Sequence, residues 1–129
     1  MVELQAVDRW QAIEELIGHL VADGKISLEH RAPITESVKK RERSMSTGIG
    51  FGIAIPHAST DLVKDVVRIF GRSKNGIDFV ALDGKPVHKV ALFLVPQGEF
   101  QKHTHQLAEL AKQMHRKDFR DGFGEDPGN

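Results

Sequence analysis

The sequence contains no cysteine and no tyrosine, and it has only one tryptophan among its 129 residues. Without cysteine, the chain offers no disulfide, no thiolate nucleophile and no cysteine-based zinc site. Aromatic residues make up 6% of the chain, which argues against the stacking platform that proteins use to bind unpaired bases. Histidine, of which there are seven, is therefore the residue type that can carry the chemistry.

The chain also lacks an excess of either charge, because eighteen basic residues balance eighteen acidic ones. A neutral protein has no electrostatic basis for binding nucleic acid or an anionic membrane as its main partner. No apolar run approaches the roughly 20 residues of a membrane-spanning helix. The first ten residues lack the basic start and apolar centre of a signal peptide. We therefore expect a cytoplasmic protein that is not embedded in a membrane.

Three segments have the pattern of helices. The first runs from about Asp8 to about Ala22, where apolar residues recur at helical spacing. The second lies between Ser27 and Arg43, and a start near Arg31 would place Pro33 in the first turn, where proline is tolerated. The last runs from about residue 102 to about residue 116, and the tail at 122–129 is expected to be frayed or truncated.

The strand signals lie between the second and third helices. A glycine-rich loop at 46–52 leads into a short strand, Ile53 to Ile55, that stops at Pro56. Further strands are expected at 66–70, 77–81 and 86–95, the last two flanking the hairpin signal Asp83-Gly84. Residues 90–95 are apolar on both faces, as in a central strand. The pattern predicts one α/β domain over 1–129, a mixed parallel and antiparallel sheet with helices on both faces.

His57 is the first candidate for a reactive residue. It ends the apolar strand segment and follows a rigid proline, and α/β folds place their chemistry at strand ends. The amides of Gly48, Gly50 and Gly52 could approach an anion closely. Arg41, just upstream, carries the guanidinium fork that suits phosphate. The alternative is a structural histidine that caps a strand.

His103 is the second candidate. It shares one helical stripe with three apolar residues of the last helix, Leu107, Leu110 and Met114, and so points inward at the helix start, where an anion is favoured. His105 faces elsewhere. The alternative for His103 is a histidine that only packs there. The pair could suggest a metal, but its imidazoles point to different faces and no HExxH spacing occurs, so we expect no metal site.

The chain contains a long motif that reads Arg41-Glu42, then Ser46-Thr47-Gly48-Ile49-Gly50, then Gly52-Ile53-Ala54-Ile55-Pro56-His57. This motif resembles the signature of the enzyme IIA domains of the bacterial sugar phosphotransferase system, of the fructose, mannitol and nitrogen-regulatory class. Similar segments follow at 76–79, 82–87, 94–96, 107–111 and 119–120. The resemblance implies that His57 is the phosphorylated histidine, that His103 and Arg41 assist it, and that Thr47 lies near the phosphate.

The resemblance also implies a function. His57 would accept a phosphoryl group from a small carrier protein, HPr, and pass it to an enzyme IIB domain for sugar uptake, without metal or nucleotide. The alternative is a regulatory module that binds target proteins according to its phosphorylation state. Where Phe51 stands, many members have a small polar residue. We expect Phe51 to contact the docked partner, and the alternative is that it packs under the loop as a core residue.

Overall fold

The computed structural model describes residues 1–98, which form a mixed sheet with helices packed against it. The elements in chain order are β1 (Val2–Glu3), α1 (Arg9–Ala22), the 3-10 helix η1 (Leu28–His30), α2 (Arg31–Ser44), β2 (Gly48–Gly50), β3 (Ile53–Ala54), β4 (His57–Thr60), β5 (Val67–Ile77) and β6 (Val87–Pro96). The helix expected at about 102–116 and the tail at 122–129 lie outside the described residues.

Strand β6 is central to the sheet, whose order is β1-β5-β6-β3-β2. One edge of β6 pairs with β5 in antiparallel register. The other edge pairs in parallel first with β3 and then with β4, so residues 53–60 follow β6 along most of its length. This pairing confirms the mixed sheet and the central position of the apolar run at 90–95, in which every residue is buried.

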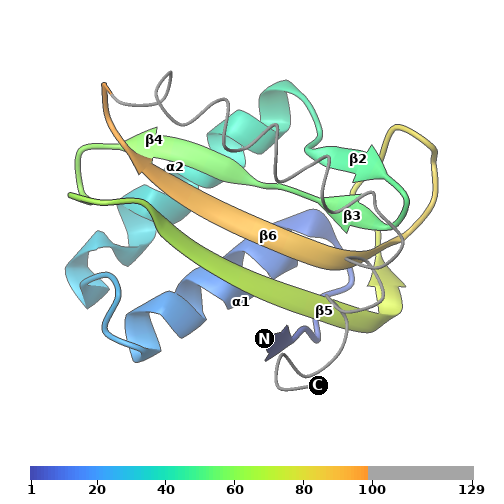
Figure 1. Ribbon diagram of the computed structural model, residues 1–129, viewed down its shortest axis with the longest axis horizontal. Coiled ribbons are helices and arrows are strands. Elements are labelled where there is room, and N and C mark those ends of the chain that lie inside the picture. Colours follow the sequence, from blue (N-terminus) through green and yellow to red (C-terminus); the bar gives the residue numbers. More distant parts are fainter. Residues whose placement is uncertain (99–129) are drawn as a thin grey trace.

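Helices α1 and α2 lie side by side on one face of the sheet (Figure 1). Their buried residues include Ile13, Ile17, Ile34 and Val38, and they form one core with alternate residues of β6 such as Leu92. The residues of β6 that point to the opposite face belong to a second, smaller cluster, which holds Ile53, Ile55, Ala91 and Phe93. The sheet is thus apolar on both faces, as the sequence pattern predicts.

Both α-helices of the described residues begin where the sequence predicts. The side chain of Asp8 caps α1 by accepting a hydrogen bond from the amide of Gln11 at 2.8 Å. Helix α2 starts at Arg31, so Pro33 is its third residue and costs no internal hydrogen bond.

Three strand predictions were wrong. Residues 78–81 form no strand, because β5 already ends at Ile77 and a loop over 78–86 leads to β6. Gly48–Gly50 is strand β2, although we expected the whole segment 46–52 to be a loop. A further strand, β4, begins at His57, whereas we expected His57 to end a strand. The proline before it supplies no amide hydrogen, so the strand is interrupted there and resumes with the histidine.

Candidate functional site

His57 lies where the chain passes from β3 to β4 along β6. Ile55 and Pro56 separate the two strands, and pairing with β6 continues through the amide of Phe93, which donates to the Pro56 carbonyl at 3.0 Å. The backbone on both sides of His57 is therefore fixed by the central strand. A side chain held in this way has a preset direction, which a reactive group requires.

The imidazole of His57 has a defined tautomer. Its Nδ1 is 2.9 Å from the carbonyl oxygen of Ile55. A carbonyl oxygen can only accept, so Nδ1 carries the hydrogen, and in the uncharged ring Nε2 carries the lone pair. The lone pair is what a nucleophile needs, and the hydrogen bond at Nδ1 keeps it on Nε2.

His57 is half-buried, and its burial lowers the pKa below the ordinary value of about 6.5. The positive charge of Arg41 lowers the pKa further. The bond to Ile55 and the negative charge of Glu42 act in the opposite direction, and the net shift is downward. At neutral pH the ring is therefore uncharged, which is the form that can attack an electrophile.

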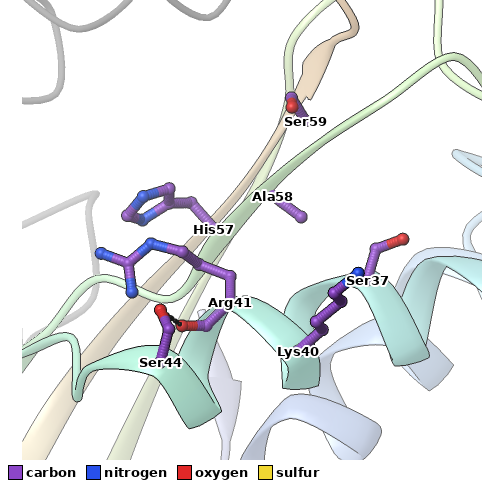
Figure 2. Close-up of a pocket in the computed structure, with 7 residues that line it drawn as sticks. All are labelled: Ser37, Lys40, Arg41, Ser44, His57, Ala58 and Ser59. Carbon is purple, nitrogen blue, oxygen red and sulfur yellow. Dashed lines mark hydrogen bonds between the residues drawn. The ribbon is translucent and has the colours of Figure 1, made fainter.

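Arg41 reaches the same site from α2, which packs against β4. Figure 2 shows its guanidinium group beside the imidazole of His57. The Nη1 of Arg41 donates to the Met45 carbonyl at 2.9 Å, which holds the side chain across the end of the helix. The structure thus brings together two of the residues that the sequence singles out, from segments sixteen positions apart.

The hollow around these two residues is lined mostly by residues with polar or positively charged side chains. Its described lining residues are Ser37, Lys40, Arg41, Ser44, His57, Ala58 and Ser59, of which two are cationic and none is acidic. Its volume of about 560 Å³ is far larger than a phosphoryl group. Sequence reasoning missed Lys40, which gives no signal apart from its helical proximity to Arg41.

The three glycines of the motif lie elsewhere. Gly50 and Gly52 line a separate hollow with Phe51, on the side of the loop before β6. The Gly52 carbonyl accepts from the amides of His88 and Lys89 at 2.8 and 2.9 Å. The amide of Gly48 donates to the hydroxyl of Ser46 at 3.1 Å. In the described residues Gly50 and Gly52 thus shape the β2–β3 turn and Gly48 begins β2, and none of the three lines the hollow that holds His57.

Thr47 also turns away from that hollow. It is buried, and both its amide and its hydroxyl donate to Glu42, at 2.9 and 2.6 Å. Sequence reasoning missed Glu42, although a signal was present. The buried residues of α2 are Ile34, Val38 and Glu42, each four positions apart, so the acid continues the apolar stripe of the helix.

Phe51 is 63% exposed, so the alternative that it is a core residue is wrong. It lies in the tight β2–β3 turn with a positive φ of 58°, between two glycines that also have positive φ. Its amide donates to the carboxylate of Asp83 at 3.1 Å. A bulky residue in this backbone region is strained, and such strain is concentrated at functional positions.

Two further expectations concern other parts of the chain. His103 lies outside the described residues. Within residues 1–98, no group of three or more His, Asp or Glu side chains is arranged to hold a metal ion. In the same part of the chain, each helix is too short or too polar to cross a membrane.

The chain matches known proteins over most of its length. A family model described as "Phosphoenolpyruvate-dependent sugar phosphotransferase system, EIIA 2" matches residues 1–125. The chain is 36% identical over 119 residues to the fructose-specific EIIABC component of Bacillus subtilis, which covers 92% of the chain and 18% of that protein. It is 37% identical over 110 residues to the fructose-specific EIIA component of Haloferax volcanii, which covers 85% of the chain and 70% of that protein. The crystal structure of the nitrogen regulatory protein IIA-Ntr from Neisseria meningitidis superposes with a TM-score of 0.85, at 30% identity over 97% of this chain and 84% of that one.

Proposed function

Because the chain belongs to the EIIA 2 family of the phosphoenolpyruvate-dependent sugar phosphotransferase system, we propose that it carries a phosphoryl group on Nε2 of His57. The observation that carries this proposal is the hydrogen bond from Nδ1 of His57 to the Ile55 carbonyl at 2.9 Å. It leaves the lone pair on Nε2, and the guanidinium of Arg41 lies beside the ring (Figure 2).

The proposed step exchanges one nitrogen–phosphorus bond for another. Nε2 of His57 attacks the phosphorus of a phosphohistidine on the donor protein, and the bond between phosphorus and the donor nitrogen breaks as the new bond forms. The hydrogen stays on Nδ1 throughout and is donated to the Ile55 carbonyl. The phosphoryl group arrives already activated, so the step as proposed uses neither metal nor nucleotide.

Arg41 has the role of stabilising charge. Three oxygens of the phosphoryl group carry negative charge during transfer, and a guanidinium can donate two hydrogen bonds to them. Lys40 adds a second positive charge to the same hollow. We further propose, on the sequence pattern alone, that His103 donates to the phosphoryl group from the start of the last helix.

The donor that we propose is an HPr-like carrier, and the acceptor is an enzyme IIB domain. The relative in Bacillus subtilis is named as one component that combines A, B and C parts, which supports transfer from an A part to a B part. The second candidate is a regulatory module that selects its target by phosphorylation state. The likeness to the nitrogen regulatory protein of Neisseria meningitidis, 30% identical over nearly the whole chain, favours that candidate.

Phe51 is proposed as an anchor for the docked partner. It precedes His57 by six residues, so its backbone is at most about 20 Å away along the chain. A standard interface of about 800 Å² per partner is roughly 30 Å across, so one partner can cover both residues. Transfer between two histidines requires that they meet, and the area around His57 is then the docking surface.

The experiment is phosphorylation with labelled phosphoenolpyruvate, enzyme I and HPr. We expect an acid-labile phosphate on the wild type and none on His57→Ala. The matched control is His88→Ala, because the Nδ1 of His88 also contacts a backbone carbonyl, that of Ser73, at 2.8 Å. His88 does not line the hollow that holds Arg41, so its loss should leave the label unchanged. Wild-type label on His57→Ala would refute the proposal.

A second measurement separates the two candidate roles. Labelled protein is mixed with an enzyme IIB domain and, separately, with candidate target proteins. Rapid loss of label to the IIB domain supports transport. Stable binding of a target that differs between the phosphorylated and unphosphorylated forms, without loss of label, supports regulation.

A further inference from the structure

We propose that Glu42 is a positioning residue for the phosphoryl site, acting through the turn between α2 and β2 that holds Arg41 in place. The proposal rests on the proposed function, since it concerns how Arg41 comes to point at the group on His57. Glu42 itself faces away from the hollow, into the core, and is 1% exposed. It therefore touches neither partner nor phosphate.

The carboxylate of Glu42 is fully engaged. It accepts from the amide of Thr47 at 2.9 Å, from the hydroxyl of Thr47 at 2.6 Å and from Nη1 of Arg9 at 3.3 Å. A buried carboxylate is costly unless it is paired and hydrogen-bonded. Here the three bonds meet that cost, and they join α2 to the beginning of α1 and to the entry of β2.

Arg9 is itself held in place. It is the first residue of α1, and its guanidinium carbon lies 4.4 Å from the centre of the Trp10 ring. This stacking fixes the plane of the guanidinium while its Nη1 faces Glu42. The carboxylate thus has one partner whose position depends on α1 and one whose position depends on β2.

The connection to Arg41 passes through the three-residue turn at 45–47, between α2 and β2. Glu42 binds Thr47 at one end of the turn, and Arg41 binds the carbonyl of Met45 within it at 2.9 Å. The hydroxyl of Ser44 also donates to the Arg41 carbonyl at 2.8 Å, as Figure 2 shows. If Thr47 were released, the Met45 carbonyl would move, and the Arg41 side chain would lose the acceptor that orients it.

The first test is Glu42→Gln, which keeps the shape of the side chain and removes its charge. Because a displacement of about 1 Å can cost up to roughly 10²-fold in rate, we expect phosphorylation by phospho-HPr to slow by about 10- to 100-fold. The matched control is Val38→Ala, one turn earlier on the same buried stripe. Val38→Ala should destabilise the fold and leave the transfer rate of the folded protein unchanged.

The second test uses Thr47 and remains decisive if Glu42→Gln does not fold. Thr47→Ser keeps both hydrogen bonds to Glu42, and Thr47→Val keeps the shape but loses the hydroxyl. We expect a wild-type transfer rate for Thr47→Ser and a reduced rate for Thr47→Val. Equal rates for the two variants would overturn the proposal.

A double mutant identifies the path of the effect. If Glu42 acts through Arg41, then adding Glu42→Gln to Arg41→Ala should cause no further loss of rate. Multiplied losses would overturn the proposal, because Glu42 would then act independently of Arg41.

A readout that needs no phosphorylation separates this proposal from the proposed function. The Nε–H signal of Arg41 in an NMR spectrum should shift in Glu42→Gln and Thr47→Val and stay in place in Thr47→Ser and Val38→Ala. If the wild type takes up no phosphate in the phosphorylation assay, the proposed function is refuted. If the Arg41 signal does not shift in Glu42→Gln, this inference is refuted.

Discussion

Substitutions of Phe51 distinguish its contribution to stability from its contribution to partner binding. The residue is 63% exposed, so only about a third of the roughly 1.5–3 kcal/mol from burying a phenylalanine applies, or about 0.5–1 kcal/mol. Its φ of 58° adds strain, which for an L-residue is about 1–2 kcal/mol. Phe51→Ala keeps that strain, because alanine also has a Cβ, and should lower the free energy of unfolding by about 0.5–1 kcal/mol.

Asparagine at the same position should behave differently. It tolerates the left-handed region better than other side chains of its size, so Phe51→Asn should recover part of the strain and unfold at nearly the wild-type urea concentration. The control is Phe79→Ala, since Phe79 is fully buried and its loss should cost about 3–5 kcal/mol. The loss of unfolding free energy should therefore be several-fold larger for Phe79→Ala than for Phe51→Ala.

The affinity for the partner should depend on the aromatic ring of Phe51 rather than on its backbone conformation. Both Phe51→Ala and Phe51→Asn remove the aromatic surface, so each should weaken binding of the HPr-like carrier by about tenfold or more, the effect of losing about 1.4 kcal/mol. Urea unfolding gives the stability, and an NMR titration with the carrier gives the Kd. The reasoning is refuted if Phe51→Ala unfolds as easily as Phe79→Ala, or if both Phe51 variants bind like the wild type.

The remaining predictions concern the charges at the site. Burial lowers the pKa of His57 on folding, so between that pKa and about 6.5 the unfolded chain binds more protons and stability should rise with pH. If the free energy of unfolding of His57→Ala depends on pH with the same slope as that of the wild type, this prediction is contradicted. Acceptance of phosphate by the wild type should fall as the pH drops through the pKa of folded His57. Arg41→Ala and His103→Ala should each slow transfer by about 10²–10³, the effect of losing one preorganised donor, without abolishing the label. His105→Ala should be nearly neutral in the same kinetic assay, and equal losses for the two histidines would show that the expected helix phase is wrong.

Local patterns predict the two α-helices of residues 1–98 because their signals lie within a few residues. The cap at Asp8 and the apolar spacing after it define α1, and Pro33 indicates where α2 must start. The apolar run at 90–95 in β6 can also be recognised from the sequence, because the part of a strand that is covered on both faces lacks polar residues.

The strand β4 could not be predicted in this way. It reads His-Ala-Ser-Thr, which lacks the alternation of a half-buried strand, and it exists because β6 offers a free edge beyond β3. That pairing joins residues more than thirty positions apart. The position of the glycines relative to His57 could not be predicted for a related reason. Only the register of β2 with β3 reveals that Gly50 and Gly52 face the loop before β6.

For the site, sequence predicts the residues better than their partners. His57 and Arg41 come together as expected, yet the acceptor at Nδ1 is a main-chain carbonyl, for which no residue type gives a signal. Glu42 reads as one more charge on a polar helix until its spacing from Ile34 and Val38 is compared with the burial of that stripe.

The identity of that acceptor affects the stability of a phosphorylated ring. A carboxylate at Nδ1 would make the imidazole more basic, and a more basic nitrogen is a poorer leaving group. The carbonyl of Ile55 is neutral, and burial lowers the pKa of His57, so Nε2 would be a better leaving group than it would be with a carboxylate at Nδ1. Since the oxygen belongs to the main chain, replacing the isoleucine side chain would not remove it. The leaving-group character of Nε2 would thus depend on the backbone path between β3 and β4, and substitutions at position 55 that keep this path would preserve it.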